Sequence, residues 1–142
     1  MKKNRISKNW INKQRRDIYV RQSKIEGYRS RAVYKLKEIN DKFEILRNGQ
    51  SIVDLGGAPG SWSQYLSSTL KNTKLLAIDL LEIQEIKNVK LMKGDFTDDI
   101  YKQKIKSFFN TKIDLVISDM AVNTTGNKNL CLLYTSDAAD DL

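Results

Sequence analysis

The sequence contains no histidine, and it has a single cysteine, Cys131, among its 142 residues. These absences exclude a catalytic triad built on histidine and a zinc site that needs histidine or several cysteines. We therefore expect no metal, and any chemistry must rely on lysine, carboxylate, tyrosine or serine side chains, or on a bound cofactor.

Long apolar runs are missing as well. No stretch approaches the roughly 18 consecutive apolar residues of a membrane span. The basic N-terminus has no apolar run behind it, which a signal peptide would need. About 40% of the residues are hydrophobic, enough for one domain with a core. We expect a monomer in the cytoplasm with no membrane partner.

Positive charge is concentrated in the first third of the chain. The net charge is +8, and residues 1–50 carry 15 lysines and arginines against five acids, whereas residues 51–130 carry ten against nine. A basic segment on a nearly neutral domain suggests a polyanionic partner. We interpret residues 1–27 as a basic RNA-binding arm with at most one irregular helix. The alternative is a tail that only aids solubility.

Beyond the arm, the hydrophobic pattern alternates between strands and helices. Apolar residues at helical spacing from Ala32 to Phe43 predict a helix that Ser30 can cap. Continuous apolar runs predict four strands, at 51–56, 75–80, 89–92 and 113–117. Helices are expected between them, the last one capped by Asp98. Such alternation is typical of an α/β protein whose parallel sheet is covered on both faces.

Acidic side chains follow successive predicted strands. Asp79, Asp95 and Asp119 lie at or just beyond the ends of the second, third and fourth strands, and Asp54 lies where the first strand meets its loop. Ligands of open parallel sheets bind outside the carboxyl ends of the strands. One or two such acids could occur by chance, but three on successive strands favour a ligand site.

The loop after the first strand reads Asp54-Leu-Gly-Gly-Ala-Pro-Gly-Ser-Trp62. Its glycines allow a sharp turn and close approach of a ligand, and its proline is the only one in the chain. The spacing matches neither the dinucleotide fingerprint nor a P-loop, which argues against NAD and nucleoside triphosphates. Asp79 could bind both ribose hydroxyls of an adenosine. The alternative is a tight turn without a ligand.

Four segments carry a resemblance to a known family. They are Tyr28-Arg29-Ser30-Arg31-Ala32 with Lys35-Leu36, Val53 to Gln64, Gly94-Asp95-Phe96, and Ser118-Asp119-Met120-Ala121. In this order and spacing, from about Ser7 to Asn123, they resemble the FtsJ-like methyltransferases. The resemblance implies a Rossmann-like class I methyltransferase that uses S-adenosylmethionine. Its substrate would be a uridine ribose 2′-hydroxyl in 23S ribosomal RNA, with the large ribosomal subunit as partner.

The resemblance also implies roles for individual residues. The catalytic residues would be Lys35 and Asp119, the first two of four residues in a Lys-Asp-Lys-Glu set. A ribose hydroxyl benefits from a base, which Lys35 would supply, although a solvated lysine is the usual reading of such a helix position. Asp79 would hold the ribose of the cofactor and Asp95 its adenine. The full set of expected cofactor-binding residues is Asp54, Gly56, Gly60, Trp62, Asp79, Asp95 and Asp119.

The family pattern stops before the chain ends. Its members continue with three more strands that carry the second lysine and the glutamate, so residues 28–130 would be the N-terminal part of the domain, truncated after the fourth parallel strand. Residues 131–142 do not look like the family, and we interpret them as a foreign tail; a divergent natural tail is the alternative. The chain alone would then be inactive, with strand 113–117 as an exposed apolar edge.

Two other functions stay open on this sequence. One is a methyltransferase of the same superfamily that acts on a different RNA. The other is a non-catalytic RNA-binding module with a vestigial pocket. Binding of S-adenosylmethionine and methylation of any RNA would separate the second from an enzyme.

Overall fold

The computed structural model describes residues 7–120 and 131–133. Its strands form one sheet in the order β3-β2-β1-β4-β5. The helices are α1 (Lys8–Glu26), α2 (Val33–Phe43), α3 (Ser61–Thr69) and α4 (Asp99–Phe109), and the strands are β1 (Ser51–Leu55), β2 (Lys74–Asp79), β3 (Val89–Lys93), β4 (Leu115–Ser118) and β5 (Cys131–Leu133).

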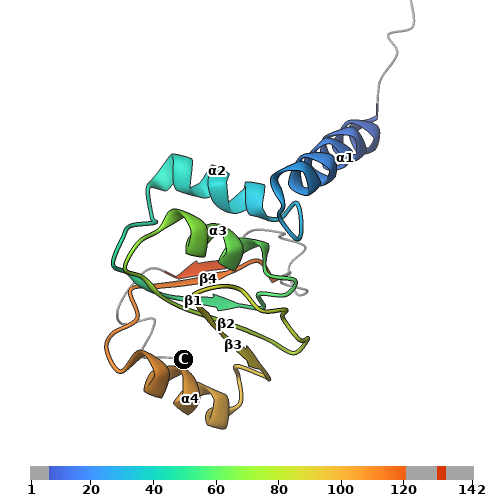
Figure 1. The fold of residues 1–142 in the computed structure, drawn as a ribbon. Helices are drawn as coiled ribbons and strands as arrows, with labels where there is room; N and C mark the ends of the chain where they lie inside the picture. Colours follow the sequence, from blue (N-terminus) through green and yellow to red (C-terminus); the bar gives the residue numbers. More distant parts are fainter. Residues whose placement is uncertain (1–6, 121–130, 134–142) are drawn as a thin grey trace, which may run out of the picture.

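Strands β1 to β4 are parallel and are sandwiched between helices (Figure 1). Helices α2 and α3 cover one face of the sheet, and α4 covers the other. The predicted α/β architecture is therefore confirmed. All four carboxyl ends of the parallel strands lie at one edge, where ligands of such sheets bind.

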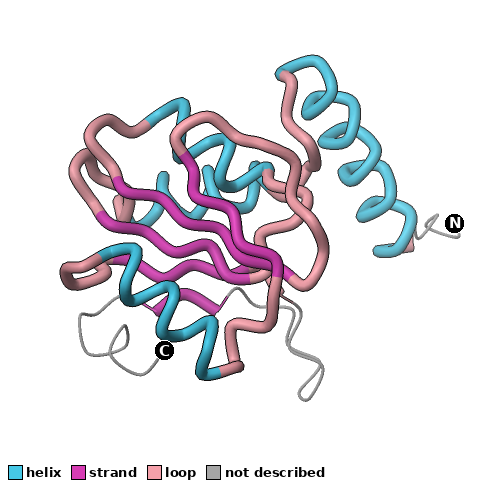
Figure 2. Tube along the Cα trace, turned by 60° about the horizontal axis from the view of Figure 1, so that its bottom comes forward, coloured by secondary structure: helices cyan, strands magenta, loops and turns pink. Residues whose placement is uncertain are grey.

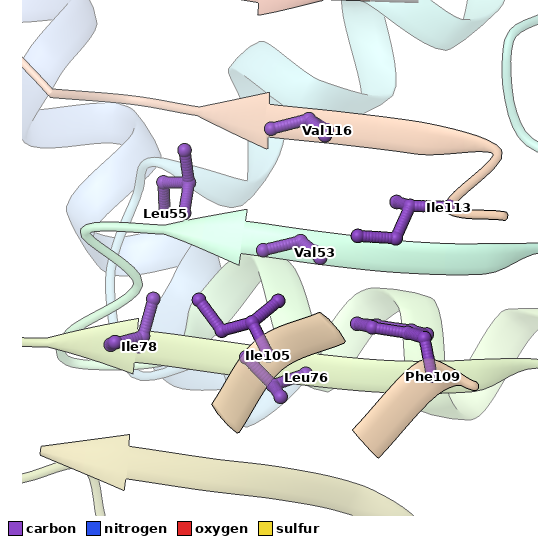
Figure 3. Close-up of a cluster of buried hydrophobic side chains, with 8 residues drawn as sticks. All are labelled: Val53, Leu55, Leu76, Ile78, Ile105, Phe109, Ile113 and Val116. Atoms are coloured by element: carbon purple, nitrogen blue, oxygen red, sulfur yellow. The ribbon is translucent and has the colours of Figure 1, made fainter. Parts of the chain in front are cut away.

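Alternation along the strands gives each face its own core. Figure 3 shows the cluster under α4, in which Ile105 and Phe109 pack against the strands. Its other members are Val53, Leu55, Leu76, Ile78, Ile113 and Val116. The opposite cluster joins Leu36 of α2 and Trp62 and Leu66 of α3 to Ile52, Leu75, Leu115 and Ile117. Asp54 lies between Val53 and Leu55, and its side chain therefore points toward α3.

The basic arm is a regular helix rather than an irregular one. Helix α1 has 19 residues, and they are exposed except for Ser23, which is buried, and Val20, which is half-buried. The Ser7 side chain accepts a hydrogen bond from the backbone of Trp10, and Gly27 ends the helix in the left-handed conformation. The helix projects away from the sheet (Figure 2). Because it lacks a broad apolar face, hydrophobic periodicity did not reveal it.

The two predicted helix caps have different outcomes. Asp98 caps α4 as expected, accepting from the amide of Ile100 at 3.1 Å. Ser30 does not cap α2, because that helix begins after Ala32 and has no side-chain cap. The Ser30 hydroxyl instead lies 2.8 Å from the hydroxyl of Ser61 at the start of α3. Ser30 therefore contacts a residue that is distant in the sequence and does not form the expected cap of its own helix.

The expectation of an exposed β4 edge is wrong. Strand β5 pairs antiparallel with β4, with Val116 opposite Leu133 and Ser118 opposite Cys131. Pairing with β1 leaves the other side of β4 with free backbone groups, which β5 satisfies. The interpretation of residues 131–142 as a foreign tail stays a prediction, and residues 134–142 of it lie outside the described residues.

Among the residues that the structure describes, no helix combines the length and apolar character needed to cross a bilayer.

Candidate functional site

A small cavity of about 90 Å³ lies at the carboxyl edge of the sheet. It is enclosed by the loop after β1, the starts of α2 and α3, and the residue after β4. Its lining residues are Ser30, Ala32, Asp54, Gly56, Gly57, Ala58, Pro59, Ser61, Trp62 and Asp119. Four predicted cofactor residues, Asp54, Gly56, Trp62 and Asp119, therefore share one cavity.

Backbone hydrogen bonds fix the glycine loop against β2. The amides of Gly56 and Gly57 donate to the carbonyl of Ile78, at 2.8 and 3.2 Å. The amide of Ala58 donates to Asp79 Oδ2 at 3.0 Å. Gly56 has a φ of 69°, and a Cβ there would collide with the side chain of Met120. Only glycine suits this position.

Arg29 ties this loop to the segment after β2. Its Nη1 donates to the carbonyls of Pro59, at 3.0 Å, and Gln84, at 2.7 Å, and its Nη2 donates to that of Glu85 at 2.7 Å. Gly60 has a φ of 119°, and a Cβ there would lie 3.0 Å from Arg29 Nη1. Sequence reasoning gave Arg29 no role beyond its place in the family motif, because its partners are carbonyls of distant loops.

Asp54 is the most perturbed acid of the site. It is 2% exposed, and its Oδ2 accepts a hydrogen bond from the Ser63 hydroxyl at 2.9 Å. Burial raises the pKa of Asp54 to about 7; the Ser63 hydrogen bond opposes the shift, and the negative charges of Asp119 and Asp79 add to it. A carboxyl held in such a place gains from a bound cation, which would favour its ionised form.

The two predicted catalytic residues meet. Lys35 Nζ donates to Asp119 Oδ1 at 2.8 Å, although the residues are 84 positions apart. Their side chains are 47% and 28% exposed, so the pair lies at the mouth of the cavity rather than inside it. Helix α2 presents Lys35 from above the sheet, while the end of β4 presents Asp119 from within it.

Trp62 lines the cavity, but it is also part of the core. Its side chain is 3% exposed, and its Nε1 donates to the carbonyl of Ala32 at 2.7 Å. This hydrogen bond joins the start of α3 to the start of α2. The geometry therefore gives Trp62 a structural role alongside the expected contact with a cofactor.

The two remaining predicted acids lie outside the small cavity. Besides binding Ala58, Asp79 accepts from the amide of Leu81 at 2.9 Å. Asp95 is exposed, and hydrogen bonds from the Thr97 hydroxyl and amide lower its pKa. The amide of Gly94 donates to the carbonyl of Asp79 at 2.9 Å, so both acids belong to the same edge. Their expected roles toward ribose and adenine stay predictions.

A larger cleft of about 670 Å³ opens beside the small cavity, between α1 and α2. We call it the α1–α2 cleft. Its lining residues are Tyr19, Ser30, Arg31, Ala32, Tyr34, Lys35, Lys37, Glu38, Asp41 and Asp119. Ser30, Ala32 and Asp119 line both spaces. The α1–α2 cleft and the small cavity therefore meet at the Lys35–Asp119 pair.

Comparisons with known proteins agree with this geometry. The family model described as FtsJ-like methyltransferase matches residues 28–136. The ribosomal RNA large subunit methyltransferase E of Pelagibacter ubique is 60% identical over 139 residues, covering 98% of this chain and 68% of the relative. The enzyme of the same name from Legionella pneumophila is 43% identical, with 89% and 63% covered. That from Rickettsia akari is 46% identical, with 86% and 56% covered.

A solved structure shares the fold. A Plasmodium falciparum protein described as a ribosomal RNA methyltransferase superposes with a TM-score of 0.61 at 35% identity, covering 70% of this chain and 60% of that one. The chain thus spans a little over half to about two thirds of the length of its relatives. Parallel sheet, glycine loop and strand-end acids define a Rossmann-like α/β protein. The chain belongs to the FtsJ-like methyltransferase family.

Proposed function

We propose that the protein, at its full natural length, transfers a methyl group from S-adenosylmethionine to the ribose 2′-hydroxyl of a uridine in large-subunit ribosomal RNA. One observation carries the proposal: the small cavity and the α1–α2 cleft meet at the Lys35–Asp119 pair. A transferase needs a donor and an acceptor side by side, with polar groups at the junction.

The small cavity suits the cationic end of S-adenosylmethionine. Two carboxyl groups, of Asp54 and Asp119, face a space of about 90 Å³, room for a part of the cofactor only. A bound sulfonium or ammonium would relieve the cost of ionising Asp54. Asp79 would bind the ribose hydroxyls and Asp95 the adenine. When bound, the cofactor supplies an activated methyl group.

On the acceptor side, Lys35 would hold the ribose hydroxyl and, with its amine in the neutral form, take the hydroxyl proton. The amine points toward Asp119 at 2.8 Å, which fixes its direction across the junction. Positioning and proton removal are the two contributions that a poor nucleophile needs most.

The partner is supported by the charge of α1 and by the relatives. The helix carries six lysines and arginines against two acids, and its basic residues are exposed. Such a surface binds phosphates without choosing a sequence. The named relatives are ribosomal RNA large subunit methyltransferases. A ribosomal substrate would place the protein in the cytoplasm.

The test is methyl transfer from labelled S-adenosylmethionine to ribosomal RNA, by the protein at its full natural length. Lys35→Ala should lower turnover by about 100-fold or more, the usual contribution of a positioned base. Calorimetry should find cofactor affinity nearly unchanged, because Lys35 acts on the acceptor. Lys112→Ala, an exposed lysine just before β4, is the matched control. A wild-type protein that neither binds the cofactor nor methylates any RNA would refute the proposal.

A further inference from the structure

The α1–α2 cleft has the size and lining of a ligand site beyond the Lys35–Asp119 pair. Its volume of about 670 Å³ lies within the roughly 300–1,000 Å³ typical of small-molecule pockets. It is bounded on one side by α2 and on the other by the middle of α1. The part nearest Asp119 would hold the acceptor ribose if the proposed function is right, and the inference below rests on that function.

Two tyrosines form the aromatic wall of the cleft. Tyr19 of α1 and Tyr34 of α2 stack with ring centroids 5.2 Å apart and an angle of 26° between the rings. Lys37 Nζ lies 5.3 Å from the centroid of the Tyr34 ring, and Tyr34 is half-buried. Tyr19 is 43% exposed. Its ring therefore offers free aromatic surface to an incoming group.

Charges of both signs line the cleft. Arg31 and Lys35 stand at the end that Asp119 shares with the small cavity. Further along α2, Glu38 and Asp41 line the cleft together with Lys37, whose ammonium pairs with Glu26 at 3.3 Å. The two acids would repel a phosphate, but their oxygens can accept hydrogen bonds from the N–H groups of a base. The end with Arg31 and Lys35 suits the phosphate, and the aromatic end, whose carboxylates can accept hydrogen bonds, suits the base.

We propose that this cleft takes one unpaired RNA nucleotide, the acceptor itself, with its base stacked on Tyr19 and its ribose 2′-hydroxyl facing Lys35 and Asp119. Proteins that read unpaired RNA use aromatic rings in this way, because every base has a face that can stack. Helix α1 would then be a wall of the acceptor site as well as a basic surface.

A purely structural role for Tyr19 is the rival explanation, since its stack with Tyr34 also holds α1 against α2. Three variants separate the two in the protein at its full natural length. Tyr19→Ala removes the ring, Tyr19→Phe keeps it, and Ile18→Ala changes an exposed neighbour that does not line the cleft.

The substrates are a ribosomal RNA methylated by the wild-type protein, with the position mapped first, and the same RNA assembled by ligation with an abasic nucleotide at that position. On intact RNA, Tyr19→Ala should lower kcat/KM by about tenfold or more, within the range of base–aromatic stacking. Tyr19→Phe and Ile18→Ala should resemble the wild type, and cofactor affinity should be unchanged in all. On abasic RNA the wild type should drop, and Tyr19→Ala should cost nothing further.

The results distinguish a failure of the stacking proposal from a failure of the proposed function. If Tyr19→Ala loses the same factor on both RNAs, the ring is structural and the stacking proposal is overturned. No loss on intact RNA overturns it as well. If the wild-type protein methylates no RNA, the proposed function itself has failed. If the wild-type protein methylates the mapped position but the effect of Tyr19→Ala does not depend on the base, the stacking proposal fails and the proposed function still holds.

Discussion

Ionising a carboxyl group that is buried in a parallel sheet costs free energy, because the charge is removed from water. Asp54 is 2% exposed in the central strand, between two strands that bury their own apolar side chains. Its Ser63 partner is a neutral hydroxyl, and within the described part of the chain no cationic side chain donates a hydrogen bond to it. Burial therefore raises the pKa of Asp54 to about 7, and Asp54 would be partly protonated near neutral pH.

The raised pKa of Asp54 predicts how the stability of the protein depends on pH. The pKa of Asp54 is raised from an ordinary value of 3.8, so the folded state holds a proton that the unfolded state has lost between about pH 4 and pH 7. Its contribution to stability is full below pH 4 and is lost as the pH rises through 7. Asp54→Asn should remove this decline, which amounts to a few kcal/mol at about 1.4 kcal/mol per pH unit.

The measurement is urea unfolding of both proteins at pH 4 to 8. The difference in the free energy of unfolding between the Asn variant and the wild type should grow in favour of the variant as the pH rises. Parallel curves would mean that Asp54 is not a neutral buried acid.

Arg29 concerns the donor side of the site. Three hydrogen bonds from one guanidinium hold the carbonyls of Pro59, Gln84 and Glu85 together. A lysine cannot reach all three, so Arg29→Lys should loosen the loop on which the proposed cofactor rests. We expect the dissociation constant for S-adenosylmethionine to rise by about tenfold, close to the loss of one charged hydrogen bond.

The same variant should change kcat at saturating cofactor much less than it changes affinity, because Arg29 does not line the junction with the α1–α2 cleft. Calorimetry measures the affinity, and steady-state assays give kcat and KM. Arg47→Lys, an exposed arginine on the loop after α2, is the matched control. An unchanged affinity for Arg29→Lys would show that the loop keeps its shape without this brace.

At the scale of elements, local sequence patterns predicted the features that depend on neighbouring residues, namely the strand positions and one helix cap. Continuous apolar runs marked the four parallel strands to within about two residues, and Asp98 was recognised as a cap from its position before an apolar helix. The meeting of Asp54 and Asp119 followed from topology, since both lie at the carboxyl edge of neighbouring strands. The Lys35–Asp119 contact was implied by the family resemblance, because spacing alone does not orient α2 over the sheet.

Contacts between elements that are far apart in the chain could not be predicted from the sequence. Lys37 shows this best: its Nζ lies 4.9 Å from the ring of Tyr28 and 5.3 Å from those of Tyr34 and Tyr65, and it pairs with Glu26 at 3.3 Å. These groups come from α1, α2, α3 and the turn between the first two. Nothing in a hydrophobic pattern places one lysine among three tyrosines. The same limit applies to Ser30, whose partner is Ser61 rather than its own helix.

Across the whole molecule, stability should be unevenly distributed. The sheet is held by apolar clusters on both faces, which supply most of the free energy of folding. Helix α1 buries only Ser23 and is attached through its second half, by the Tyr19–Tyr34 stack and the Glu26–Lys37 pair. Most of the stability of a helix in a protein comes from packing of its apolar face, and α1 buries almost none. We therefore expect α1 to unfold locally while the sheet stays intact.

Amide hydrogen exchange followed by mass spectrometry tests this difference. Amides in the first half of α1 should exchange orders of magnitude faster than those of β1 and β2, which open only when the whole domain unfolds. Low urea should accelerate exchange in β1 and leave α1 nearly unchanged, because local opening exposes little surface. If the α1–α2 cleft is the acceptor site, a methylated ribosomal RNA should slow exchange in α1, and Tyr19→Ala should remove much of that slowing. Equal protection of α1 and β1 in the free protein would contradict the expectation that α1 unfolds locally while the sheet stays folded.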